Sequence, residues 1–272
     1  MLVVRQEQMK VLERAAIQAF EDRTYRHLQQ WFPHHCELLG EDQVRRVIRH
    51  GWQKANSYDL TAECCVRSYI EFMCLLGGGF DTDILLPWAA EILNDKSSSD
   101  QVARGDRLYH RTWDYIDHIA RDYRDAAGRP TTARFMDDLR GLRDGGEETV
   151  LPAALPRFLT LLEMRFQRLF PAKCAYVGEA RVRQAVAAGV KEASGYGIMT
   201  ELGATLFTAM KFVLGGGFDT DLLLPWASAT LNDRSVTNQR SRVDKLYRES
   251  VAFLRRWWDL SSGTEDPRNV LG

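Results

Sequence analysis

The chain has 272 residues, 45% of them hydrophobic and 27% charged, which are the proportions of an ordinary globular protein. Its 36 Lys and Arg against 37 Asp and Glu leave a net charge of −1, and this argues against a nucleic-acid-binding surface, which usually makes a domain strongly basic. No run approaches the roughly 18 apolar residues of a membrane-spanning helix, and the N-terminus lacks the charged-then-apolar layout of a signal peptide.

Three helices are predicted in the first part of the chain. The segment 6–31 contains no Gly or Pro and stops at Phe32-Pro33, because proline disfavours a helical conformation of the residue before it. A second helix is expected over about 41–57 and a third over about 60–76. Further apolar residues surround the helical stripe of the third segment, so we expect it to be central and buried on several sides.

A glycine-rich motif follows the third helix. The glycines are expected to end that helix, since glycine adopts positive φ without a side-chain clash, and a phenylalanine can then fold back on the core. Either of two aspartates is suited to accept N–H bonds at the start of the next helix, in which a first-turn proline is tolerated and a tryptophan is buried. The residues concerned are Gly77, Gly78, Gly79, Phe80, Asp81, Asp83, Pro87 and Trp88.

A last helix is expected to start near Asp100. Its large apolar side chains recur at helical spacing on one face, at Tyr109, Trp113, Ile116, Ala120 and Tyr123. Beyond it, 125–130 and 144–148 have the Gly, Pro and charged residues of linkers, with a short helix predicted between them at 133–142.

The same pattern then returns 138 residues later. Of the 21 positions in 76–96, 16 are identical in 214–234, and without a gap 20–116 matches 158–254 at 35 of 97 positions. The repeated motif consists of Gly215, Gly216, Gly217, Phe218, Asp219, Asp221, Pro225 and Trp226. The stripe of the last helix is mostly repeated at Tyr247, Val251, Leu254 and Trp258.

No stretch alternates polar and apolar residues as a half-buried strand does. We therefore predict an all-α protein of two tandem homologous units, with about five helices each, that form a bilobed bundle. The predicted boundaries are 1–127 for the first unit, 128–150 for a linker, 151–262 for the second unit and 263–272 for a C-terminal tail.

Motifs of enzymes, cofactor sites and metal sites are missing from the sequence. The glycine run follows a helix and precedes aspartates, whereas a phosphate loop follows a strand and usually ends in lysine. The acidic residues lack the alternating ligands, central Gly and bidentate Glu of a calcium loop. We expect no cofactor, no metal and no catalytic residue. One acid does recur, Glu63 as Glu201, and we interpret it as a carboxylate at the start of a helix, where the helix dipole favours negative charge.

Histidines and cysteines are expected to have no catalytic role. No histidine recurs at the repeat offset, and the six are His27, His34, His35, His50, His110 and His118. Of five cysteines only Cys36 recurs, as Cys174, and their spacing fits neither a metal site nor a disulfide framework. Reduced thiols in a cytoplasmic protein are the expected state.

Tryptophans divide into two groups. Trp88 and Trp226 match each other across the repeat, as a shared core requires. Five others have no tryptophan partner and mark where the copies diverge, either toward a partner-binding surface or toward packing between the copies. These candidate partner-binding residues are Trp31, Trp52, Trp113, Trp257 and Trp258.

The glycine-rich motif, the Leu-Asn-Asp after it and the Asp-x-Leu-Tyr of the last helix (106–109 and 244–247) resemble a family of small α-helical proteins. That family is encoded in proteobacteria beside type VI secretion spike, PAAR and toxin genes, usually with one unit per chain. The resemblance implies a cytoplasmic accessory protein of a toxin-delivery module and carries over no catalytic residue. Its partner would be a secreted toxin, a spike-tip protein or another accessory protein.

Three functions are open at this point. The first is a non-enzymatic chaperone, co-chaperone or adaptor that holds a toxin or spike-tip protein in a cleft between the units. The second is an immunity protein that neutralises a cognate toxin, which the near-zero net charge disfavours because such proteins often complement their target's charge. The third is an enzyme or effector in its own right, for which no signature is present.

Overall fold

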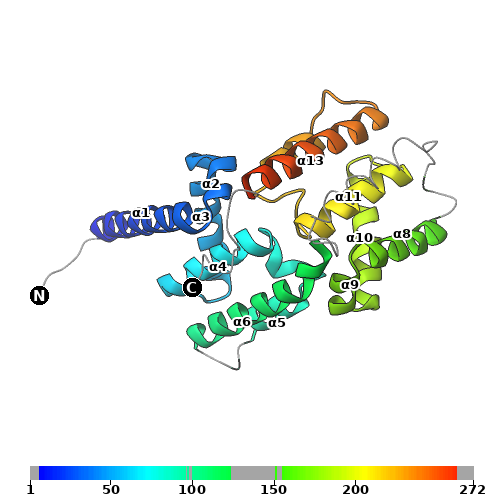
Figure 1. Cartoon of the computed structure of the whole chain (residues 1–272). Coiled ribbons are helices and arrows are strands. Elements are labelled where there is room, and N and C mark those ends of the chain that lie inside the picture. Colours follow the sequence, from blue (N-terminus) through cyan, green and yellow to red (C-terminus); the bar gives the residue numbers. More distant parts are fainter. Residues whose placement is uncertain (1–5, 96, 98–99, 124–150, 152–154, 262–272) are drawn as a thin grey trace, which may run out of the picture.

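The structure is a computed structural model and describes residues 6–95, 97, 100–123, 151 and 155–261. These residues form helices and no strand, which confirms the all-α prediction (Figure 1). The predicted linker 128–150, the helix predicted at 133–142 and the tail 263–272 lie outside the described residues, as does the side chain of Trp258. None of the described helices is long and apolar enough to cross a membrane.

The described helices of the first half precede residue 124, and those of the second half follow residue 154. The first half contains α1 (Gln6–Trp31), α2 (Pro33–Leu39), α3 (Glu41–Ser57), α4 (Glu63–Leu76), η1 (Phe80–Thr82), α5 (Pro87–Leu93), α6 (Gln101–Ile119) and η2 (Ala120–Tyr123). The second contains α8 (Leu155–Leu169), α9 (Pro171–Val177), α10 (Glu179–Gly195), α11 (Glu201–Leu214), α12 (Pro225–Leu231) and α13 (Gln239–Ser261). From α2 and α9 onward, equivalent helices start 138 residues apart, as the repeat predicts.

Two short helices were not predicted, so each half has six described α-helices and not about five. In α2 and α9 the proline occupies the first helical position, where its missing N–H costs nothing. The break before each comes from Phe32 and Phe170, whose φ angles of −130° and −128° are not helical.

The start of α4 and the buried face of α6 also differ from the prediction. Helix α4 starts at Glu63, because the N–H groups of Thr61 and Ala62 bond to Gln101 Oε1 at 2.7 and 2.8 Å. On α6, Tyr109 is 47% exposed and the buried positions include Arg104, whose guanidinium donates to the carbonyls of Tyr58 and Leu93. This contact turns the Arg104 side of α6 inward.

Helices α4 and α11 supply the centre of the core, as predicted. Every residue of 203–212 in α11 is buried, and Phe80 and Phe218 fold back on the two helices. The ring of Phe80 lies 4.9 Å from that of Tyr69, and the ring of Phe218 lies 5.0 Å from that of Phe207. Pro87 and Pro225 start α5 and α12, and Trp88 is buried.

The glycine motifs of the two halves meet face to face. Asp221 accepts a hydrogen bond from Gly78 N at 2.6 Å, and Asp83 accepts the reciprocal bond from Gly216 N at 2.7 Å. The prediction that Asp81 or Asp83 caps the next helix is wrong, since α5 has no side-chain cap, and neither has its counterpart α12. The carboxylates of Asp83 and Asp221 instead each join their own loop to the other half, in the reciprocal pattern of a twofold axis.

Each half also contacts the second helix of the other half. Asp122 of η2 accepts hydrogen bonds from the backbone N–H groups of Ala172 and Lys173 at the start of α9, at 2.8 and 2.6 Å. On the opposite side, the ring of His35 in α2 lies 4.6 Å from that of Trp257 in α13. The two halves are thus interlocked through η2 with α9 and α13 with α2.

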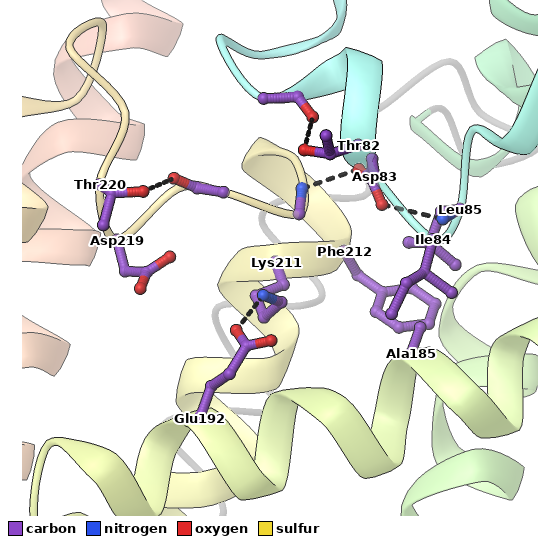
Figure 2. Close-up of a pocket in the computed structure, with 13 residues that line it drawn as sticks. Thr82, Asp83, Ile84, Leu85, Ala185, Glu192, Lys211, Phe212, Asp219 and Thr220 are labelled. Atoms are coloured by element: carbon purple, nitrogen blue, oxygen red, sulfur yellow. Dashed lines mark hydrogen bonds and ion pairs between the residues drawn. The ribbon is translucent and has the colours of Figure 1, made fainter. Parts of the chain in front are cut away.

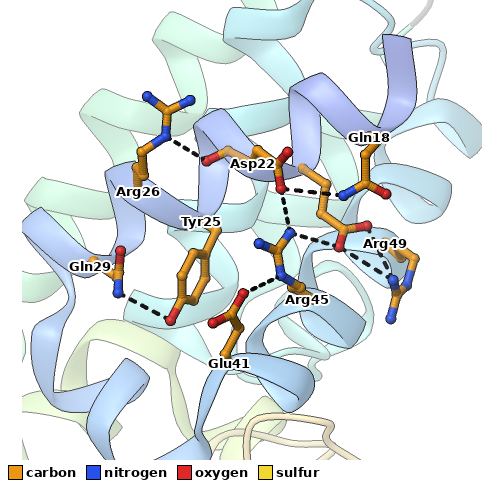
Figure 3. Close-up of polar contacts among 9 residues, drawn as sticks. Gln18, Asp22, Tyr25, Arg26, Gln29, Glu41, Arg45 and Arg49 are labelled. Carbon is orange, nitrogen blue, oxygen red and sulfur yellow. Dashed lines mark hydrogen bonds and ion pairs between the residues drawn. The ribbon is translucent and has the colours of Figure 1, made fainter. Parts of the chain in front are cut away.

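A charged cluster joins α1 to α3 (Figure 3). Arg45 on α3 forms ion pairs with Glu21, Asp22 and Glu41, and its guanidinium lies 5.0 Å from the Tyr25 ring centre. Glu21 is buried but is satisfied by Arg45 and Arg49, as a buried carboxylate must be. These ion pairs attach α1 to α3 beside the apolar contacts of Phe20 and Leu28.

Candidate functional site

A cavity of about 520 Å³ lies between the two halves and is lined by both, and we call it the axial cavity. Its volume falls in the range of small-molecule and cofactor sites. Most of its lining residues form pairs at the repeat offset. These pairs are His35 and Lys173, Leu75 and Val213, Leu76 and Leu214, Gly77 and Gly215, Asp83 and Asp221, Leu86 and Leu224, Tyr115 and Phe253, Ile116 and Leu254, and Ile119 and Trp257.

The two aspartates at the axial cavity do not offer free charges. Asp83 accepts from Leu85 N and Gly216 N, and Asp221 accepts from Leu223 N and Gly78 N. Burial raises the pKa of the Asp221 carboxyl, while its two N–H bonds oppose that rise. Both carboxylates are occupied by hydrogen bonds that join the two halves, so the remaining surface of the axial cavity is mainly apolar.

One pair in the lining consists of two different basic side chains: His35 corresponds to Lys173. Burial lowers the pKa of His35 to about 4, so its imidazole is neutral at pH 7, although it bonds to the backbone of Cys74. The ammonium of Lys173 donates to the Phe212 carbonyl and lies 5.9 Å from the Tyr115 ring centre. The lining of the axial cavity therefore includes one neutral imidazole and one lysine amine.

The predicted partner-binding tryptophans are separated by the fold. Trp113 and Trp257 both line the axial cavity. Trp31 lies 6.1 Å from the His27 ring and Trp52 packs against the core, and neither is part of the cavity lining. For Trp258 only the backbone is described.

Sequence reasoning missed an aromatic column that leads into the axial cavity. The Trp226 ring stacks on Phe253 at 5.4 Å, and Phe253 stacks on Trp257 at 6.0 Å. Phe253 and Trp257 are four residues apart on α13, and this spacing is the signal that could have paired them. Trp226, which was assigned to a shared core, lies at the outer end of this column and is only partly buried.

The other candidate side chains are dispersed. Glu63 and Glu201 are the first residues of α4 and α11, and Glu63 pairs with Arg23 at 2.8 Å on an exposed surface. His27 pairs with Glu71 at 2.7 Å. Within the described part of the chain no group of His, Cys, Asp and Glu could hold a metal ion, and all five cysteines are free thiols.

The axial cavity thus presents apolar and aromatic surface, one imidazole and one lysine amine. No protein-family model, curated protein or solved structure matches this chain. Its function must therefore be inferred from the arrangement of its own residues.

Stability is expected to fall in acid because of His35. Its pKa of about 4 in the folded state lies below the 6.5 of an exposed imidazole, so the unfolded state binds the proton more readily. The stabilisation is complete above pH 6.5, decreases as pH falls, and is lost at about pH 4. This amounts to about 3 kcal/mol.

Urea unfolding of the wild type and of His35→Phe at pH 7, 5.5 and 4.5 measures this contribution. The wild type should lose up to about 3 kcal/mol more than the variant over this range. The exposed His110, replaced by Gln, is the control and should leave the wild-type pH profile unchanged. Equal pH profiles for wild type and His35→Phe would contradict the assignment.

Proposed function

We propose that this chain is a non-enzymatic protein-binding factor, a chaperone or adaptor, which holds an apolar segment of a partner protein in the axial cavity. The observation that carries the proposal is the cavity itself, lined by both halves and by two tryptophans that the repeat does not require. Tryptophan is enriched among the residues that dominate protein–protein binding energy. The partner segment would bury its side chains against Trp113, Trp257 and Ile116.

In this proposal the two halves act as equivalent units of a bilobed bundle, 1–127 and 151–262, joined by the linker 128–150. The cavity lies at their junction, so a small change in the angle between the units would widen or close it. The reciprocal aspartate bonds and the contact between His35 and Trp257 support such a shared junction. A second protein that competes for the cavity could then release the bound segment.

The resemblance to proteins encoded beside type VI secretion genes suggests the partner's class. In that setting the bound segment belongs to a secreted toxin, a spike-tip protein or another accessory protein, held in the cytoplasm before export. The axial cavity supports this role because an apolar segment of a toxin that is not yet bound to the secretion apparatus is stabilised when it is buried away from water.

A cavity-filling variant tests the proposal. Ile119 lines the cavity at the position where the second half has Trp257, so Ile119→Trp introduces a side chain that this site of the repeat already accepts. Co-expressed with toxins encoded beside its gene, the wild type should raise the soluble or exported amount of one of them. Ile119→Trp should lose at least about tenfold of that effect, as expected when a central anchor is blocked.

Val102→Trp is the matched control, since Val102 lies on the same helix, is 48% exposed and does not line the cavity. This variant should behave like the wild type, and circular dichroism should show that both variants are folded. If the wild type alters no neighbouring toxin, or if Ile119→Trp acts as well as the wild type, the proposal is wrong. If the wild type instead protects cells that make active toxin, the chain is an immunity protein.

A further inference from the structure

A second cavity, of about 290 Å³, lies beside α10 and α11 and is distinct from the axial cavity in its polar character (Figure 2). Its charged lining residues are Glu192, Lys211, Asp219 and Asp83. We call it the acidic pocket. Its volume is at the lower end of the range of ligand sites, so it suits a group the size of one side chain rather than a large cofactor.

The repeat shows what Asp219 lacks. Its counterpart in the first half, Asp81, is buried and accepts a hydrogen bond from Tyr58 OH at 2.9 Å. Asp81 also forms an ion pair with the ammonium of Lys54 at 2.6 Å. The first-half carboxylate is therefore neutralised by a cation supplied by the chain itself.

The second half keeps the hydroxyl and loses the cation. Tyr196 OH donates to Asp219 at 2.8 Å, and the pKa of Tyr196 is raised to about 12, mainly by burial and then by this bond, so it stays a donor. At the position of Lys54 the second half has Glu192. Among the described residues, no ammonium or guanidinium forms an ion pair with Asp219.

A lysine is present in the acidic pocket but is held elsewhere. Lys211, which stands where the first half has Met73, is only 8% exposed and forms its ion pair with Glu192. Figure 2 shows this pair on the α10 and α11 side of the pocket, with Asp219 apart from it. The exchange of Lys54 for glutamate and Met73 for lysine thus moves the internal cation away from the aspartate.

The charge that remains in the acidic pocket is negative. Glu192, Asp219 and Asp83 are three carboxylates against the single ammonium of Lys211. Both oxygens of Asp83 already accept backbone N–H bonds, and the hydroxyls of Thr82 and Thr220 donate to the carbonyls of Gly79 and Gly217. Glu192 pairs with Lys211, whereas Asp219 accepts one bond, from Tyr196, and has no cation beside it among the described residues. This balance disfavours an anion beside Lys211.

We propose that the acidic pocket binds a primary ammonium or guanidinium group, which takes at Asp219 the place that Lys54 takes at Asp81. The group would be either the head of a small amine or the side chain of a lysine or arginine on a partner protein. Asp83 lines both cavities, but the proposal does not require the function proposed above.

Titration with n-butylammonium and agmatine tests the site, with calorimetry and saturation-transfer NMR as readouts at low ionic strength. The wild type should bind at least one probe saturably, and the affinity should fall as salt is added, since the contact is an ion pair. Asp219→Asn should weaken binding by about tenfold or more, because the hydrogen bond to a charged group is lost. The exposed Asp117, replaced by Asn, is the control and should leave binding unchanged.

A swap of first-half residues into the second half provides the sharper variant. The double change Glu192→Lys with Lys211→Met reproduces the pairing of Lys54 and Met73, so its own ammonium should occupy Asp219 and abolish probe binding. Its thermal unfolding midpoint should be no lower than that of the wild type. This variant keeps the test decisive if Asp219→Asn unfolds.

The origin of the cation is tested with the capped peptide acetyl-Gly-Lys-Gly-amide. Tighter binding of this peptide than of n-butylammonium assigns the pocket to a partner side chain, and weaker binding assigns it to a free amine. Absence of saturable binding of either small probe to the wild type overturns the proposal. Unchanged binding in the swap variant overturns it as well.

Discussion

Replacing Gly77 with alanine is expected to lower the free energy of unfolding by about 3–5 kcal/mol, the sum of a strained backbone and an overpacked contact. Gly77 ends α4 with φ 98° and ψ 150°, a conformation almost restricted to glycine. A Cβ there would lie 2.9 Å from the carbonyl oxygen of Leu214, a backbone atom that cannot rotate away. Gly215 repeats the arrangement, with φ 104° and 3.0 Å to the carbonyl oxygen of Leu76.

Gly178→Ala separates the two causes. Gly178 has φ 89° and ψ 147°, close to the angles of Gly77, but a Cβ there would meet nothing within 4 Å. This variant should cost only the backbone strain, about 1–3 kcal/mol. Urea unfolding of the three proteins gives both numbers. If Gly77→Ala costs no more than Gly178→Ala, the close approach of the two halves at this junction does not constrain the fold.

Trp88→Ala is expected to destabilise the protein by about 3–5 kcal/mol, the usual cost of emptying a buried aromatic site. The Trp88 side chain is 6% exposed, and its ring lies 6.2 Å from that of Tyr115. Its repeat counterpart Trp226 is only partly buried and stacks on Phe253, so Trp226→Ala should cost less, about 2 kcal/mol. The identical motifs predict equal losses, whereas the packing predicts unequal ones.

Guanidinium unfolding of the two variants distinguishes these expectations. Trp226→Ala should also disturb the axial cavity, because its ring supports Phe253 and, through it, Trp257. A loss in Trp226→Ala equal to that in Trp88→Ala would show that α12 is anchored as firmly as α5. In that case the aromatic column of Trp226, Phe253 and Trp257 would belong to the core and not to the axial cavity.

The site was only partly accessible from the sequence. The absence of a matching tryptophan across the repeat drew attention to Trp113 and Trp257, which line the axial cavity, and equally to Trp31 and Trp52, which do not. A tryptophan without a match shows only that the two copies differ at that position. Such differences also arise where the packing of the core differs between the copies, so they do not identify a binding site by themselves. Only the tertiary structure shows that Trp113 on α6 and Trp257 on α13 line the cavity, whereas Trp31 and Trp52 do not.

The helices themselves follow from the sequence, because their causes are local. The first proline after α1, the glycines after α4 and the 3.6-residue periodicity act over a few residues, and α3 and α10 end where these signals predict. The repeat likewise predicted equivalent helix starts, since the same local sequence makes the same local bonds. Even α2 and α9, which were missed, obey a local rule for proline.

The two cavities depend on contacts between residues far apart in the chain. His35 contacts Trp257, and Gly78 contacts Asp221, although these residues are far apart in the sequence. The periodicity of apolar residues predicts helices but not such long-range contacts. The same holds for Asp219, for which the sequence shows only that the second half has Glu192 in place of Lys54 and Lys211 in place of Met73. Only the packing of α10 on α11 shows that Lys211 turns to Glu192 and leaves that carboxylate without its cation. The sequence determines which charged side chains are present, but tertiary packing decides which of them lie next to each other.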